Sequence, residues 1–190
     1  MKPVLLALGT LALSGQPPKA VLAPLPGQLR SQPLLDRTDG KPLLLGKTTA
    51  KAILAHRASF RDNLAKVKLP EALKARWKVV QRPLTLVAVF GSWCEDSHRQ
   101  LPGLLALAAE PNPFIEVHYL GVNRDLALDP KAWPKGCIPP GVDRVPSFYL
   151  FAARPDGGQR LAGAVVENPP KAGQTMAEAL VELVEHPAIL

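Results

Sequence analysis

Apolar segments of the chain predict four strands. The run 84–90 is almost wholly apolar, which is typical of a central strand that is buried on both of its faces. A second strand is expected over 114–122. Two further segments, 147–151 and 160–166, flank a turn whose Asp-Gly and Gly-Gly pairs supply the positive φ angles of a tight hairpin. We therefore expect a sheet that contains at least one hairpin.

Apolar residues that recur at steps of three and four predict helices. One amphipathic helix is expected to begin at Ala50, and Arg57 is the polar exception on a face that otherwise consists of Ala50, Ile53, Phe60, Leu64 and Val67. A shorter helix follows. It has Pro70 at its first position, where the missing N–H costs nothing, and it ends near Val79.

Two more helices follow the first and the last predicted strand. The helix 94–109 contains Pro102, which kinks it, and its apolar face consists of Leu101, Leu104, Leu105 and Ala108. The last helix begins at the capping box Thr175-x-x-Glu178, in which each side chain satisfies a backbone N–H of the other residue. The apolar face of this helix consists of Met176, Leu180, Leu183 and Val184.

The order of these elements predicts an α/β fold with a central mixed sheet, built as βαβ and then ββα, flanked by helices and preceded by an N-terminal helical extension. A βαβ crossover is right-handed, so the strands 84–90 and 114–122 should be parallel neighbours. The stretch 124–141 is rich in proline and glycine and is expected to be a loop with a short helix.

The pattern changes before residue 47. Residues 16–46 contain six prolines, a density that forbids a continuous helix or a central strand. They form a linker or a wrapped arm. We assign the globular domain to 47–190, with its core at about 80–186.

Residues 1–15 resemble a secretory signal peptide. One positive charge precedes an apolar stretch of suitable length, and small residues stand near Ala12 and Ser14. We expect an exported, periplasmic or extracytoplasmic protein; the alternative is a cytoplasmic protein whose first segment packs on its own surface. The apolar run is too short to cross a bilayer, so no integral membrane span is expected. N-terminal sequencing of the native protein tests this prediction.

Charge is divided unevenly along the chain. Residues 1–80 hold 14 Lys and Arg against 4 Asp and Glu, whereas residues 81–190 hold 9 against 12. A basic half can bind an anionic partner or a membrane surface, yet no nucleic-acid-binding motif accompanies it. We interpret the basic half as solvated helix faces and expect no nucleic-acid partner. The oligomeric state stays open.

The chain contains two cysteines, Cys94 and Cys137. Two are too few for a disulfide scaffold, and neither lies in a cluster of His and Cys residues that would hold zinc, so no metal is expected. Cys94 lies where the strand 84–90 turns into a helix. Helix N-termini carry partial positive charge and unpaired N–H groups, so a thiol held there is more readily a thiolate. We predict Cys94 as the nucleophile.

The neighbours of this cysteine are predicted to modulate it. Trp93 can supply an apolar surface for binding a disulfide. Ser97 can donate a hydrogen bond to the thiolate, and a protonated His98 would also favour the thiolate form. Glu95 and Asp96 oppose it through like-charge repulsion, although acids in a first helical turn also complement the helix dipole.

The segment Trp93-Cys94-Glu95-Asp96-Ser97, a proline eight residues after the cysteine and the Val145-Pro146 pair at the start of a strand together resemble the thioredoxin-like superfamily over about residues 80–185. The resemblance implies that Pro146 is a cis-proline next to the cysteine and that the backbone of Val145 pairs with a bound peptide. The pattern Trp-Cys-x-Asp-Ser is also similar to a bacterial branch in which serine is usual at this position.

The chain departs from thioredoxins at two positions. Ser97 replaces their second cysteine, and Ala88 replaces a buried acid. Because a serine cannot resolve a mixed disulfide, the resemblance implies single-cysteine exchange that contributes to redox homeostasis. Cys94 would react with disulfide- or thiol-containing proteins or peptides, and an external thiol such as glutathione, rather than a bound cofactor, would release them.

Two alternatives stay open at this point. Cys137 is expected to be a passive loop cysteine, but it could also act as a distant resolving thiol. The alternative function is a non-catalytic thioredoxin-fold module that binds peptides or proteins, in which Cys94 is an inert, partly buried thiol.

Overall fold

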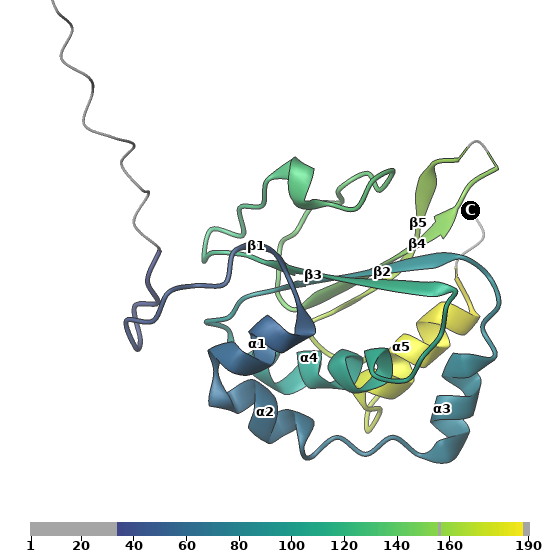
Figure 1. Cartoon of the computed structure of the whole chain (residues 1–190), viewed down its shortest axis with the longest axis horizontal. Helices are drawn as coiled ribbons and strands as arrows, with labels where there is room; N and C mark the ends of the chain where they lie inside the picture. The colour runs from purple at the N-terminus through teal and green to yellow at the C-terminus, as the bar shows by residue number, and fades with distance from the viewer. Residues whose placement is uncertain (1–33, 156, 188–190) are drawn as a thin grey trace, which may run out of the picture. The chain divides into compact units, whose positions relative to one another are not determined.

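The computed structural model describes residues 34–155 and 157–187, and within them five strands form one mixed sheet with the order β1-β3-β2-β4-β5 (Figure 1). The predicted signal segment and the first part of the predicted arm lie outside the described residues. The strands are β1 Gly46–Thr48, β2 Leu84–Phe90, β3 Ile115–Gly121, β4 Ser147–Ala153 and β5 Gln159–Val166.

The strand pairing confirms the predicted topology. β2 lies in the centre, parallel to β3 and antiparallel to β4, and β4 forms the hairpin with β5. Gly157 in the hairpin turn has a φ of 82°, which glycine adopts without cost. The sequence pattern missed β1, because three residues are too few to show a period. β1 lies antiparallel to β3 at the edge of the sheet.

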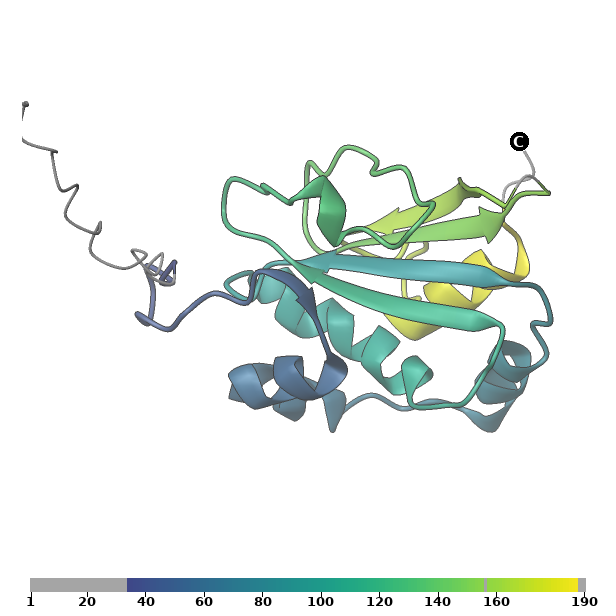
Figure 2. The ribbon, with the colours of Figure 1, turned by 45° about the horizontal axis from the view of Figure 1, so that its top comes forward.

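Five α-helices occupy the described residues, and all of them lie on one face of the sheet (Figures 1 and 2). They are α1 Ala50–His56, α2 Ala58–Leu64, α3 Glu71–Lys78, α4 Glu95–Ala108 and α5 Met176–Glu185. The predicted capping box at the start of α5 is confirmed, since the Thr175 and Glu178 side chains each bond the other's backbone N–H. No helix of the described residues is long and apolar enough to cross a membrane.

The prediction of one helix from Ala50 was wrong. Arg57 has extended backbone angles, φ −135° and ψ 140°, and it separates α1 from α2. Its guanidinium group bonds the carboxylates of Asp36 and Asp39, and the Asp36 oxygen lies 2.8 Å away. The polar exception on the predicted apolar face is therefore the position at which the helix breaks, because the break turns Arg57 toward these carboxylates.

Two details of the later helices also differ from the prediction. Pro70 is the residue before α3 rather than its first residue. In α4, Leu107 is fully buried, whereas Ala108 is exposed and lines an open surface hollow beside Trp77. Leu107 is buried because α4 packs against α2, α5 and the sheet together, which makes its buried surface wider than one helical stripe, whereas Ala108 is the last residue of the helix. Leu101, Leu104 and Leu105 are buried as predicted.

The central strand separates two apolar cores. Leu86, Ala88 and Phe90 face the helices and belong to the larger core, while Val87 and Val89 face the opposite side. On that side the chain between β3 and β4, residues 122–146, covers the sheet with Val122, Trp133, Cys137 and Val145. This loop carries one short 3₁₀ helix, η1, Pro130–Ala132, which confirms the predicted loop with a short helix.

The described end of the proline-rich arm, residues 34–45, packs against the sheet edge and the loop before α4. The backbone N–H of Leu44 donates to the Ser92 hydroxyl at 3.0 Å. Leu44 also lies so close to Gly121 that a Cβ added there would stand 2.2 Å from the Leu44 carbonyl oxygen. The arm therefore contacts the segment that leads directly to Cys94.

Candidate functional site

Cys94 is the residue that immediately precedes α4, at the end of the short turn that follows β2. Its backbone N–H donates to the Gly91 carbonyl at 3.0 Å, and its own carbonyl accepts the first helical hydrogen bond, from His98. Gly91 lies directly beneath the Trp93 indole, where an added Cβ would be 2.7 Å from the ring. A larger residue at this position would therefore push the indole out of its place over the turn.

The thiol of Cys94 stands at a helix terminus without a side-chain cap. Cys94 makes no capping hydrogen bond to the first-turn amides of α4, and its residue is partly exposed. The first-turn N–H groups of a helix have no partner within the helix, and together they carry a partial positive charge. These amides can donate to a sulfur anion or to a negatively charged group that approaches it.

The cis peptide bond between Val145 and Pro146 confirms the predicted cis-proline. The Cys94 thiol donates a hydrogen bond to the Val145 carbonyl oxygen, with an S···O distance of 3.3 Å. The two motifs, which are 51 residues apart in the chain, thus meet in one site. The Val145 carbonyl is occupied by the thiol, but the Val145 N–H has no hydrogen-bond acceptor within the described residues.

Ser97 is fully buried, and its hydroxyl accepts a hydrogen bond from the Gly91 N–H at 3.2 Å. No hydrogen bond joins it to Cys94 in the part of the chain that the structure describes. The expected support of the sulfur by this hydroxyl is therefore absent from the structure. Ser97 instead fixes the turn that presents the cysteine.

His98 is also directed away from the sulfur. Its Nε2 atom lies 2.9 Å from the Ser92 carbonyl oxygen, so this nitrogen carries the proton and donates it. The ring packs edge-on against Phe60, with the centroids 4.7 Å apart. The Asn63 amide holds the His98 carbonyl at 2.9 Å. The imidazole therefore ties the start of α4 to α2 and to the turn.

The two predicted acidic neighbours lie in the first turn of α4. Glu95 is exposed, and Asp96 forms an ion pair with Arg99 one turn further along the helix. Both carboxylates complement the positive end of the helix. The charge of Asp96 is partly balanced by its arginine partner.

Trp93 is half-buried and only partly available as an apolar surface. Its indole N–H donates to the Val122 carbonyl oxygen at 3.0 Å, which holds the ring over the core on the loop side of the sheet. The Arg124 guanidinium lies over the ring, 4.6 Å from its centroid. One face of the predicted disulfide-binding surface is thus covered by a cation.

Arg124 belongs to an ion-pair network that the sequence analysis missed. The Asp36 carboxylate is almost fully buried, and it bonds Arg57 at 2.8 Å and Arg124 at 3.3 Å. A hydrogen bond from the Thr38 amide, with the two guanidinium groups, holds the pKa of Asp36 below its usual range. These residues come from the arm, the helix break and the loop after β3, so no local pattern connects them.

Cys137 lies in the smaller core and is buried. Burial, with the charge of Glu116 as a smaller cause, raises the pKa of its thiol to about 11. Such a thiol stays protonated near neutral pH and is a poor nucleophile. No group of three His, Cys, Asp or Glu side chains that could hold a metal ion occurs among the described residues.

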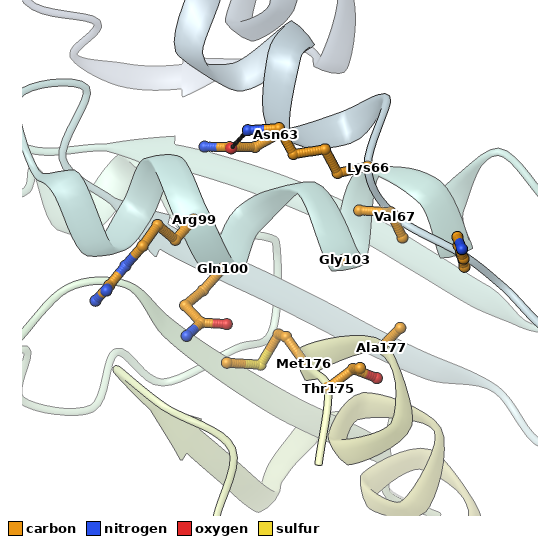
Figure 3. Close-up of a pocket in the computed structure, with 10 residues that line it drawn as sticks. Asn63, Lys66, Val67, Arg99, Gln100, Gly103, Thr175, Met176 and Ala177 are labelled. Atoms are coloured by element: carbon orange, nitrogen blue, oxygen red, sulfur yellow. Dashed lines mark hydrogen bonds between the residues drawn. The ribbon is translucent and has the colours of Figure 1, made fainter. Parts of the chain in front are cut away.

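A cavity of about 470 Å³ opens on the helical side, between the end of α2, the middle of α4 and the start of α5 (Figure 3). Asn63, Gly103 and Met176 are among the residues that line it, and Cys94 is not. Figure 3 shows Arg99 extending away from the cavity centre. The Cys94 thiol therefore belongs to the surface formed by the turn, Trp93 and the cis-proline, and not to this cavity.

Comparison with known proteins gives one family and two structures. Residues 47–132 match the family model described as Thioredoxin, a range that includes Cys94 and ends before Val145 and Pro146. A protein of unknown function from Pseudomonas aeruginosa is 20% identical, with a TM-score of 0.45, over 74% of this chain and 86% of that one. An HIV epitope scaffold is also 20% identical, with a TM-score of 0.44, over 74% of this chain and 87% of its own. The search of curated proteins found no match.

Proposed function

Because this chain is a thioredoxin-like protein, by its fold and by the family model that matches residues 47–132, we propose that it carries out thiol–disulfide exchange through Cys94. One observation carries the proposal. The partly exposed Cys94 thiol stands at the uncapped N-terminus of α4, 3.3 Å from the carbonyl oxygen that precedes the cis-proline. At this position the sulfur lies beside N–H groups that can donate to a negatively charged group approaching it.

The first step is attack of the Cys94 thiolate on one sulfur of a substrate disulfide. The Cys94–sulfur bond forms, the substrate S–S bond breaks, and the second substrate sulfur leaves as a thiolate. In the resting state the thiol proton of Cys94 forms the hydrogen bond to the Val145 carbonyl oxygen. When the thiolate forms, this proton passes to solvent or to the leaving sulfur. The free N–H of Val145 is available to a carbonyl of the substrate backbone, which would align the disulfide with the attacking sulfur.

The second step requires a thiol from outside the protein. Ser97 occupies the position from which a second cysteine would attack, and its hydroxyl is committed to the Gly91 amide. Cys137 is buried and protonated. An external thiolate such as glutathione would therefore attack the mixed disulfide, forming its own disulfide with the substrate sulfur and restoring Cys94.

Reduction of insulin disulfides by the purified protein tests this mechanism. We expect acceleration over the protein-free reaction only when glutathione is added, and no acceleration by the Cys94→Ser variant, because release depends on the external thiol. Activity without an added monothiol would contradict the single-cysteine mechanism. Loss of that activity in Cys137→Ser would then identify Cys137 as the second thiol.

The same assay separates catalysis from binding alone. A module that only binds peptides would give no acceleration with or without glutathione. It would also retain a disulfide-free peptide partner in the Cys94→Ala variant. That pair of results would overturn the exchange proposal.

A further inference from the structure

Arg124 holds a positive charge over the ring of Trp93, the residue next to Cys94. Its guanidinium lies 4.6 Å from the centroid of the Trp93 ring, and Trp93 is the residue next to Cys94. The indole is itself fixed by its hydrogen bond to Val122. A cation that is held on a fixed ring moves less than a free surface side chain, so its charge stays close to the residue that precedes Cys94.

The charge of Arg124 is anchored without being cancelled. Its partner Asp36 also forms an ion pair with Arg57, which in turn pairs with Asp39. The Arg57 side chain is only 10% exposed. Lys41 adds a third cation near Asp39. Three cations thus share two carboxylates, and the Arg124 side chain remains 40% exposed. Part of this side chain is therefore open to solvent, where an anion can approach it.

A small cavity of about 100 Å³ lies beside Arg124. It is lined by Arg124 together with Arg37 and with the apolar side chains Leu34, Leu35 and Leu43. Asp125 also lines it, and the Asn123 amide bonds that carboxylate at 3.3 Å. Two arginines and one aspartate thus line the cavity together with apolar side chains, so a short chain that ends in a carboxylate would meet a lining with net positive charge.

We propose that Arg124 is a specificity-determining residue that selects disulfides carrying a carboxylate close to the reacting sulfur. The proposal rests on the exchange reaction at Cys94 and adds its substrate class. The arm contributes through Asp36, which positions the guanidinium. Glutathione disulfide and peptides with an acidic residue next to the cysteine belong to this class.

Two small disulfides test the preference directly. Dithiobis(nitrobenzoate) carries two carboxylates, and dithiodipyridine carries no charge near neutral pH. In both reactions the Cys94 thiolate forms a bond to one reagent sulfur and releases the other half as a coloured thiolate or thione, so the rate follows from absorbance. The phase to be compared is the one that is absent in Cys94→Ser, which removes any contribution of Cys137.

The quantity compared is the rate with the anionic disulfide divided by the rate with the neutral one. We expect Arg124→Gln to lower this ratio by about threefold to fivefold, the upper end of the effect that one exposed charge pair has. Arg76→Gln is the matched control. Arg76 pairs with Glu185 on the α3 and α5 side of the molecule, so its loss removes one charge without touching the site. The control ratio should equal that of the wild type.

The salt dependence of the wild type supplies a test that does not require a variant to fold. At about 1 M salt the screening length falls to about 3 Å, so the ratio should decrease toward that of Arg124→Gln. An unchanged ratio in Arg124→Gln, or an equal fall in Arg76→Gln, would overturn the role of Arg124 while leaving exchange at Cys94 intact. Failure of wild-type Cys94 to react with either disulfide would instead refute the proposed function and this inference with it.

Discussion

The Trp93 indole and the Gly91 backbone form the floor of the site. The ring is held between the turn beneath it and the Arg124 guanidinium above it, and its N–H is bonded to Val122. The position of the sulfur follows from this packing, because Cys94 is the next residue in the chain. A change at Gly91 should therefore reach the thiol without altering any reactive group.

We expect Gly91→Ala to destabilise the fold by about 1–3 kcal/mol, as overpacking does, and to slow the reaction of Cys94 with a neutral disulfide. The added Cβ would lie 2.7 Å from the indole and would force the ring to move. Urea unfolding followed by tryptophan fluorescence measures the first effect, and the absorbance assay measures the second.

Gly141→Ala is the matched control, since an added Cβ there meets nothing within 4 Å. Its unfolding free energy and its reaction rate should match those of the wild type. Equal behaviour of the two glycine variants would show that the indole does not position the sulfur.

Single residues were predictable from sequence where a motif fixes the backbone. Cys94 and the Val145-Pro146 pair meet as expected, because the resemblance to thioredoxin-like proteins implies both motifs and their place beside each other. The partners of Ser97 and His98 were not predictable. Their side chains follow the path of the turn and bond Gly91 and Ser92 instead of the sulfur, and a residue pattern does not encode that direction.

At the scale of elements, the arm and the break between α1 and α2 form one unit. Arg57 leaves the helical conformation, and its guanidinium joins two carboxylates of the arm. Asp36 then links this unit to the loop that follows β3 through Arg124. The ion pairs thus connect three segments that are distant in the sequence.

Asp36→Asn should lower the free energy of unfolding by about 2 kcal/mol near neutral pH, because it weakens charge-assisted hydrogen bonds of a buried group. The pKa of Asp36 is lowered in the folded state, so the carboxylate stabilises the fold fully above its unfolded pKa of about 4. That contribution is lost as the pH falls toward the folded pKa. The difference between wild type and variant should therefore shrink at about pH 3.

Urea titrations of both proteins at the two pH values measure this difference. Asp62→Asn is the control, since Asp62 is exposed on α2. It should match the wild type at neutral pH. A difference for Asp36→Asn that is the same at both pH values would contradict the assigned role of its charge.

Elements with a clear period were predictable, whereas elements set by contacts between segments were not. The apolar run of β2 and the period of α4 predicted bounds within a residue or two, and the capping box predicted the start of α5. The helix break at Arg57 depends on carboxylates about twenty residues earlier in the chain. β1 depends on pairing with β3, and neither dependence leaves a local pattern.

For the whole described domain, the two faces of the sheet are covered in different ways. The α-helices pack on one face, and the loop 122–146 covers the other (Figure 2). The element order predicted the mixed sheet and its central strand, but not that the helices share one face. The Cys94 thiol lies at the end of the sheet where the turn before α4, the arm and this loop meet, so all three contribute to the candidate site.

The central claim is that Cys94 alone forms a mixed disulfide that an external thiol resolves. Its most direct test is the intact mass of the native protein after incubation with glutathione disulfide and again after addition of reduced glutathione. We predict one glutathione adduct on the wild type, its removal by reduced glutathione, and no adduct on Cys94→Ser. An unmodified wild type, or an equal adduct on Cys94→Ser, would contradict the account.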